Sequence, residues 1–151
     1  MVLSLIIHIL GAVVWVGGMF LAFVVLRPAF GDLEPPTRIS LWRGVFKRFF
    51  PWVWASILGL LVSGYAMLFA GFGGFAGAGI HIHIMNLTGL IMMALFVYLY
   101  YVPWRRLQAG LDGGDIAAAA GQLGLIRMIV GINLVLGLFT CAIGASGRYW
   151  G

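Results

Sequence analysis

The chain has 151 residues, enough for one domain; 63% of them are hydrophobic and only 9% are charged. A soluble domain carries about 25% charged residues, so this composition excludes a surface that faces water on all sides. The net charge of +5 does not indicate nucleic-acid binding, because the basic residues lie at the ends of long apolar runs, a pattern typical of membrane orientation. We therefore expect an integral membrane protein surrounded by lipid.

Four apolar runs are long enough to cross a bilayer, whose hydrocarbon core requires about 20 helical residues. The predicted spans cover residues 2–26, 51–70, 84–102 and 128–145, and none contains Asp, Glu, Lys or Arg. A helix satisfies every backbone polar group internally, as lipid requires. Short connections between such spans predict an all-α, up-down-up-down four-helix bundle that forms one domain over residues 1–151.

The connections between these spans differ in charge. The first and third contain eight of the nine basic residues, whereas the second contains none. Because basic connections stay in the cytoplasm, both termini are expected on the outer, periplasmic side of a bacterial inner membrane. Residues 41–50, LWRGVFKRFF, are expected to lie along the inner membrane surface with their bases among the headgroups. The alanine run at residues 117–120 is expected to form a helix that leads into the fourth span.

All three histidines are expected near the outer membrane face. His8 lies nineteen residues before Arg27, a rise of about 28 Å along a helix. His83 lies twenty-two residues before Arg105, a rise of about 33 Å. This agreement within about one helical turn favours a shared ligand over two unrelated interfacial histidines. His81 points about 200° away from His83 on a helix, and which of the two is a ligand stays open.

The first functional hypothesis is a haem b site between His8 and His83. One helical face of the first span carries small residues and an aromatic ring beside His8. They are Gly11, Ala12 and Trp15. Such a face either allows close helix packing or forms a flat recess for a macrocycle with two histidine ligands. Arg148 would then meet the propionates, and the protein would transfer electrons between a membrane carrier such as quinone and a redox protein.

The second hypothesis is copper binding or transport. His81, His83 and Met85 place imidazole and thioether groups at the outer mouth, and thioethers suit Cu(I). On this hypothesis further methionines extend a sulfur path inward, namely Met19, Met67, Met92, Met93 and Met128. Methionine also fills gaps in apolar cores, and Met85 lies at an awkward angle to His83, so we expect most of these methionines to be core residues.

The third hypothesis is a non-catalytic accessory protein within a larger membrane complex or a homo-oligomer. The acidic residues all lie in the connections, which disfavours a proton pump because such pumps need an acid or histidine relay across the membrane. Asn86 and Asn133 are the remaining strongly polar groups in mid-chain, and we expect them to form hydrogen bonds between helices.

Four stretches of the chain resemble the copper-resistance protein D (CopD-like) membrane family. They are HILGAVVWVGGMFLAFVVLRP, RFFPWVWASILGLLVSGYAM, HIHIMNLTGLIM and IRMIVGINLVLGL. The resemblance covers nearly the whole chain, is most specific at the His and Trp-Val-Gly-Gly element of the first span, and implies copper handling.

The chain is more distantly similar to HemJ-type protoporphyrinogen oxidases, four-helix membrane proteins that bind haem b. This similarity implies that His8 and His83 occupy the haem-ligand positions. Those oxidases carry a lysine shortly after the second histidine, where this chain has Met85. Protoporphyrinogen oxidation is therefore disfavoured, and whether the chain is a membrane oxidoreductase stays open.

Overall fold

The computed structural model describes residues 1–150 apart from the side chain of Arg148. The helices along the chain are α1 (Val2–Phe20), α2 (Arg27–Ala29), α3 (Pro35–Phe72), α4 (Ile80–Tyr101), α5 (Pro103–Asp112) and α6 (Ile116–Ser146). Shorter elements are a π-helical turn and two 3-10 turns, at Leu21–Leu26, Phe75–Gly77 and Gly147–Tyr149. No strand occurs within residues 1–150.

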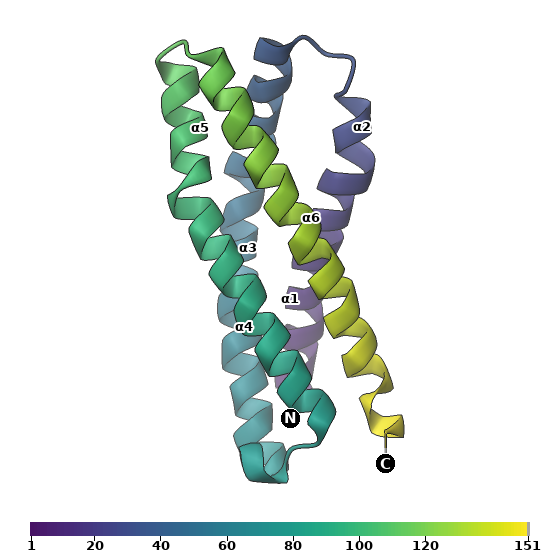
Figure 1. Ribbon diagram of the computed structural model, residues 1–151. Coiled ribbons are helices and arrows are strands. Elements are labelled where there is room, and N and C mark those ends of the chain that lie inside the picture. The colour runs from purple at the N-terminus through teal and green to yellow at the C-terminus, as the bar shows by residue number, and fades with distance from the viewer. Residues whose placement is uncertain (151) are drawn as a thin grey trace.

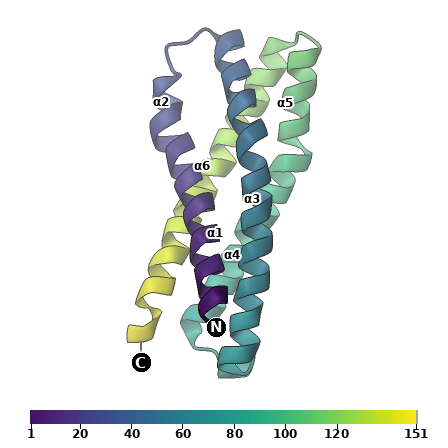
Figure 2. The same cartoon turned by 180° about the vertical axis from the view of Figure 1, so that it is seen from behind.

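Four helical segments are each long and apolar enough to cross a membrane. They are α1 with α2, α3 alone, α4 with α5, and α6 alone, and they run alternately up and down (Figures 1 and 2). α1 packs along α3 and α6, while α4 and α5 pack along α6. The predicted all-α four-helix membrane bundle is confirmed.

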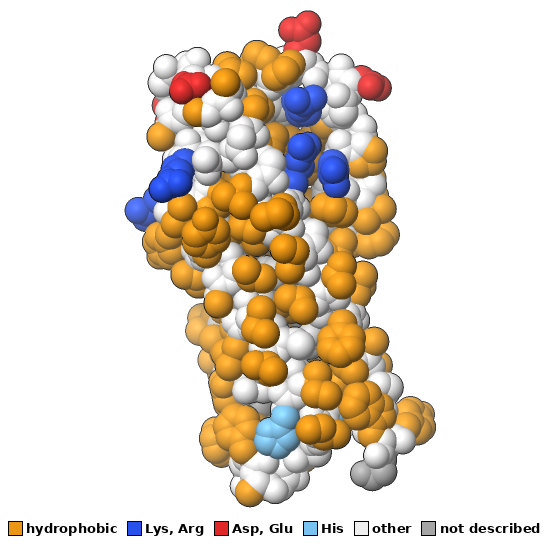
Figure 3. Space-filling model, in the orientation of Figure 1, with side chains coloured by type: hydrophobic (Ala, Val, Ile, Leu, Met, Phe, Trp, Pro, Cys, Tyr) orange, Lys and Arg blue, Asp and Glu red, His pale blue; other side chains and the backbone are white. Residues whose placement is uncertain are grey.

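The two ends of the bundle differ in chemistry. Both termini lie at one end, near all three histidines, and we call it the histidine end. The connections before α3 and before α6 lie at the opposite end, which we call the basic end. Figure 3 shows a broad hydrophobic band between the charged side chains of the basic end and a histidine at the other end. Large side chains such as Val62 and Val135 are exposed in this band, as a lipid-facing surface requires.

Residues 41–50 are not the separate surface segment that the sequence led us to expect. They form part of α3, a continuous helix of 38 residues that passes through Pro51. Trp42, Phe46 and Phe50 recur every four residues and are almost completely buried. The expectation was wrong because the neighbouring basic residues hid this aromatic stripe, whose burial holds the segment upright in the bundle.

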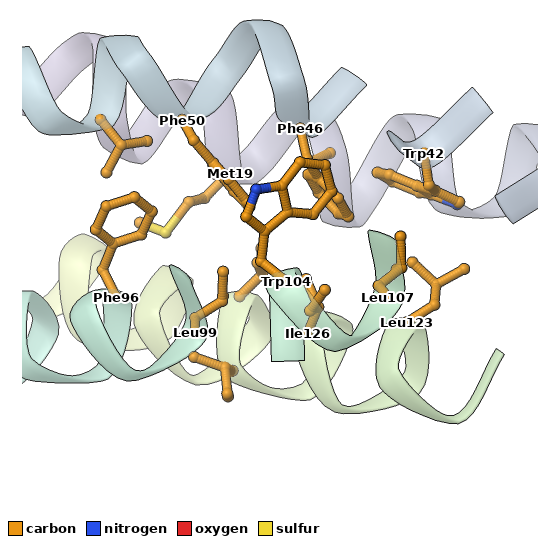
Figure 4. Close-up of a cluster of buried hydrophobic side chains, with 14 of the residues drawn as sticks. Met19, Trp42, Phe46, Phe50, Phe96, Leu99, Trp104, Leu107, Leu123 and Ile126 are labelled. Atoms are coloured by element: carbon orange, nitrogen blue, oxygen red, sulfur yellow. The ribbon is translucent and has the colours of Figure 1, made fainter. Parts of the chain in front are cut away.

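An aromatic core fills the half of the bundle toward the basic end. We use this name for Trp42, Phe46, Phe50, Phe96 and Trp104. Within α3, Trp42 stacks on Phe46 at 5.0 Å and Phe46 stacks on Phe50 at 5.1 Å between ring centroids. Trp104 meets Phe50 edge to face at 5.2 Å, and Figure 4 shows these rings facing one another between the helices. Such contacts add to the hydrophobic burial and hold the helices in one arrangement.

Two prolines and a capping aspartate mark the points where one helical segment ends and the next begins. Pro28 lacks an N–H group, and α1 widens into the π-helical turn just before it, as expected where a regular ladder is interrupted. α4 ends at Tyr101, and after the cap residue Val102 the ring of Pro103 begins α5. The side chain of Asp115 accepts a hydrogen bond of 3.0 Å from the backbone N–H of Ala118, which caps α6. The expected helix over the alanine run is confirmed.

Candidate functional site

His8 lies between α1 and α3, where Ser63 holds its ring. Its Nδ1 is 3.0 Å from the Ser63 hydroxyl oxygen, and that hydroxyl donates to the carbonyl of Gly59. Because the serine proton is already used, this geometry favours the tautomer in which Nδ1 donates to Ser63 and Nε2 is the unprotonated nitrogen. A Cβ at Gly64 would lie 3.1 Å from the Cε1 of His8, so glycine is needed for this close approach.

The small residues beside His8 pack against protein. A Cβ at Gly11 would lie 3.2 Å from the Cγ of Leu60, so α3 occupies the space beside this glycine. Trp15 is only 2% exposed and meets Phe96 edge to face at 6.3 Å. Ala12 is half-buried on the same helix. These contacts correspond to close helix packing, the alternative to a haem recess.

His83 lies on a different surface from His8. It is exposed, and its ring stacks on Phe75 of the 3-10 turn at 5.9 Å between centroids. The two imidazoles therefore pack against different elements, and α3 fills the space beside His8. The haem site with both histidines as ligands stays a prediction. The expected contact of Arg148 with propionates concerns a side chain outside the described residues.

His81 and Met85 lie one turn apart on α4 and both face α6. A Cβ at Gly147 would overlap the imidazole of His81, and a Cβ at Gly144 would lie 2.9 Å from the Cε of Met85. His81 and His83 point to different neighbours, in keeping with the expected angle between them. The structure therefore pairs Met85 with His81, whereas the proposed copper set of the sequence also included His83.

This face of α4 continues inward as a line of thioether and hydroxyl groups. We call the contact between α4 and α6 the glycine seam. On α4 it comprises His81, Met85, Thr88 and Met92. Opposite them lie Asn133, Gly137, Thr140 and Gly144 of α6 and Gly147 of the 3-10 turn that follows α6. The hydroxyl oxygens of Thr88 and Thr140 are 2.7 Å apart, between the levels of Met85 and Met92.

The deepest part of the glycine seam combines two sulfurs and an amide. A Cβ at Gly137 would lie 3.1 Å from the Cε of Met92 and 3.5 Å from the Cε of Met19, so both methionines reach this glycine. Asn133 donates through Nδ2 to the backbone carbonyl of Met92 at 3.1 Å. Its Oδ1 is buried and has no hydrogen-bond partner within the described part of the chain. An unpaired buried acceptor is costly, and an ordered water or a bound ion can satisfy it.

The two asparagines that the sequence singled out do connect helices. Asn133 joins α6 to α4, and Asn86 accepts a hydrogen bond of 3.1 Å from the hydroxyl of Tyr65 on α3. The expectation of interhelical hydrogen bonds is confirmed. The role of Asn133 in completing the donor set beside Met92 was not anticipated. The spacing of four residues from His81 to Met85, opposite glycines on α6, was the signal in the sequence.

The donor chemistry of the glycine seam limits which ions it can hold. Among residues 1–150, no group of three His, Cys, Asp or Glu side chains lies close enough together to hold a metal. The soft donors of the glycine seam are thioether sulfurs beside one imidazole, and thioether sulfur prefers soft ions such as Cu(I). Toward the basic end the seam meets Phe96, which packs against Phe50 at 5.5 Å. The seam thus runs from the histidine end, where His81 and Met85 are partly exposed, to the buried Met92 and Asn133 beside the aromatic core.

Comparison with known proteins places the chain in a family. It matches no curated protein and no solved structure. The family model for copper resistance protein D matches residues 43–146, which are 104 of the 151 residues. This match covers most of the chain and contains the whole of α4, α5 and α6. The chain belongs to the copper resistance protein D family of membrane proteins.

Proposed function

We propose that this protein binds Cu(I) in the glycine seam and carries it from the histidine end toward the middle of the membrane. The observation that carries the proposal is that His81 and Met85, one turn apart on α4, lie against Gly147 just after α6 and Gly144 within it. Imidazole and thioether together suit Cu(I) better than harder ions. Family membership supports the proposal, because the matched residues 43–146 include both side chains.

The donors follow one another along the path at short intervals. Met92 lies seven residues after Met85, about 10 Å along α4, and the hydroxyls of Thr88 and Thr140 lie between them. Met92, Met19 and the unpaired Oδ1 of Asn133 then form the deepest donor group. All of these donors are uncharged, which suits a monovalent ion that must lose its water in an apolar setting.

The test is Cu(I) binding by the full-length protein purified in detergent. Copper content is measured after loading under reducing conditions, and affinity is measured by competition with a Cu(I) chelator. We expect His81→Ala and Met85→Leu each to weaken binding at least tenfold, or about 1.4 kcal/mol. The matched controls are His83→Ala and Met93→Leu on the same helix, which should bind copper as the unaltered protein does. A protein that takes up no stoichiometric copper, or controls that lose as much affinity, would contradict the proposal.

Haem b binding is the less favoured alternative, and one observation speaks for it. The bond of His8 to Ser63 leaves Nε2 free, the arrangement of many metal-bound histidines. The packing of Gly11 against Leu60 leaves no flat surface beside His8 on which a porphyrin ring could lie. An absorption spectrum of the protein from haem-replete cells separates the two functions. We expect no Soret band, whereas a Soret band that disappears in His8→Ala would favour haem over copper.

A further inference from the structure

A groove opens on the membrane surface at the basic end, away from the glycine seam. It has a volume of about 560 Å³ and lies between the π-helical turn that follows α1 and the facing side of α6. Its walls include Phe23 and Arg27 from the first helical segment and Arg127, Gly131, Val135 and Leu136 from α6. The groove therefore has two guanidinium groups at one end and an apolar remainder.

Within the part of the chain that the structure describes, no carboxylate forms a salt bridge with the arginines of this groove. Arg27, Arg38 and Arg127 lie close enough for the charges of the first two to act on the third. Among the described side chains the salt bridge present joins Arg43 and Asp112, on α3 and α5. Figure 3 shows basic side chains gathered just above the hydrophobic band on this face. Like charges held together without a carboxylate favour an anion between them.

The groove is built so that Arg27 stays at its mouth. The guanidinium carbon of Arg27 lies 4.9 Å from the centre of the Phe23 ring, a cation–π contact. Phe23 in turn lies against Gly131, where a Cβ would come within 2.7 Å of the ring. The glycine thus lets the ring lie close to α6, and the ring supports the arginine.

The rest of the groove fits a hydrocarbon chain. From Arg127 to Leu136 the groove follows α6 for nine residues, about 14 Å toward the middle of the membrane. Met128, Ile132 and Val135 are exposed along this stretch, with exposed fractions of 56%, 44% and 68%. A charged mouth at headgroup depth and an apolar trough below it match the two halves of one phospholipid.

We propose that this groove is a specific site for an anionic phospholipid. Its phosphate would lie between Arg27 and Arg127, because guanidinium groups bind phosphate oxygens through paired hydrogen bonds. One acyl chain would lie along α6 beside Gly131 and Val135. The site is separate from the glycine seam, so it would hold lipid whether or not copper is bound.

The test is lipid binding to the full-length protein in detergent, followed by native mass spectrometry. Phosphatidylglycerol and phosphatidylcholine are the two probes. We expect phosphatidylglycerol to bind at least tenfold more tightly, and the double variant Arg27→Gln/Arg127→Gln to lose this preference. The matched control is Arg105→Gln/Arg106→Gln, which removes the same charge at the same end. Arg105 also lies 4.9 Å from the ring centre of an aromatic residue, Tyr101.

Two further measurements keep the site apart from general charge effects and from misfolding. Val135→Trp should fill the trough and weaken phosphatidylglycerol binding at least fivefold without a change of charge. Inorganic phosphate at millimolar concentration should not displace the lipid. The proposal is overturned if the Arg27/Arg127 variant keeps its preference, if the control variant loses it equally, if Val135→Trp binds normally, or if inorganic phosphate competes fully.

Discussion

The two helix contacts near the histidine end are built from similar residues but differ in what they leave free. Between α1 and α3, Ser63 bonds to Nδ1 of His8, and Leu60 fills the space beside Gly11. In the glycine seam, His81 has no hydrogen bond among those of the described residues, and Met85 passes over Gly144. The imidazole of His8 thus has a hydroxyl partner on α3, whereas the imidazole of His81 lies over Gly147 and meets the ring of Trp150 edge to face at 6.4 Å.

The largest expected effect compares the histidines of the two contacts directly. The double variant His81→Ala/Met85→Leu should lose at least one hundredfold in Cu(I) affinity, about 2.7 kcal/mol, because both donors of the outer site are removed. His8→Ala should change that affinity less than twofold. Chelator competition measures both. If the His8 variant loses copper as strongly, the contrast between the two contacts does not hold.

Adding one methyl group to each contact should have opposite consequences. A Cβ at Gly18 would overlap the ring of Phe49, so Gly18→Ala should destabilise the bundle by about 2 kcal/mol through overpacking. A Cβ at Gly144 meets only the flexible end of Met85. Gly144→Ala should therefore cost less than about 1 kcal/mol but shift Met85 and weaken Cu(I) binding several-fold. Thermal unfolding in detergent and copper competition are measured for both variants. The prediction is contradicted if Gly144→Ala loses more stability than Gly18→Ala, or if Gly18→Ala loses more Cu(I) affinity than Gly144→Ala.

The hydrogen bond that holds His8 predicts a moderate effect on stability alone. Ser63→Ala removes the partner of Nδ1 and should lower the free energy of unfolding by about 1 kcal/mol, the usual size for a polar contact between membrane helices. Copper affinity should not change. The measurement is the unfolding midpoint, with Ser40→Ala, at an exposed position of α3, as the control. A large loss of copper in Ser63→Ala would assign His8 to the metal site.

The smallest expected change in stability is at Asn133. Asn133→Leu removes its bond to the carbonyl of Met92 together with a buried acceptor that has no partner, so the two effects should nearly cancel, to within about 1 kcal/mol. The amide oxygen also disappears from the deepest donor group. Transport of Cu(I) into vesicles should therefore fall while binding at His81 and Met85 stays. Unchanged transport with unchanged stability would exclude Asn133 from the path.

The four spans were predictable because hydropathy and length act along a single segment and need no knowledge of its neighbours. The segment at residues 41–50 shows the limit of prediction from the properties of a single segment. Its basic side chains indicated a position on the membrane surface, yet Trp42, Phe46 and Phe50 are buried in α3. Burial of these rings depends on the partner helix that supplies Trp104, which no local pattern reveals.

By itself the sequence determined the number of spans and the approximate depth of each histidine, since a helix rises by the same amount at every residue. It also determined that His81 and His83 point in different directions. Only the tertiary structure decided which direction meets α6. The rotation of a helix about its axis is set by the sum of its packing contacts, here the glycines that receive His81 and Met85. The packing of α4 thus brings His81 and Met85 to glycines at the end of α6 and just after it, while the pairing of His8 with His83 stays a prediction.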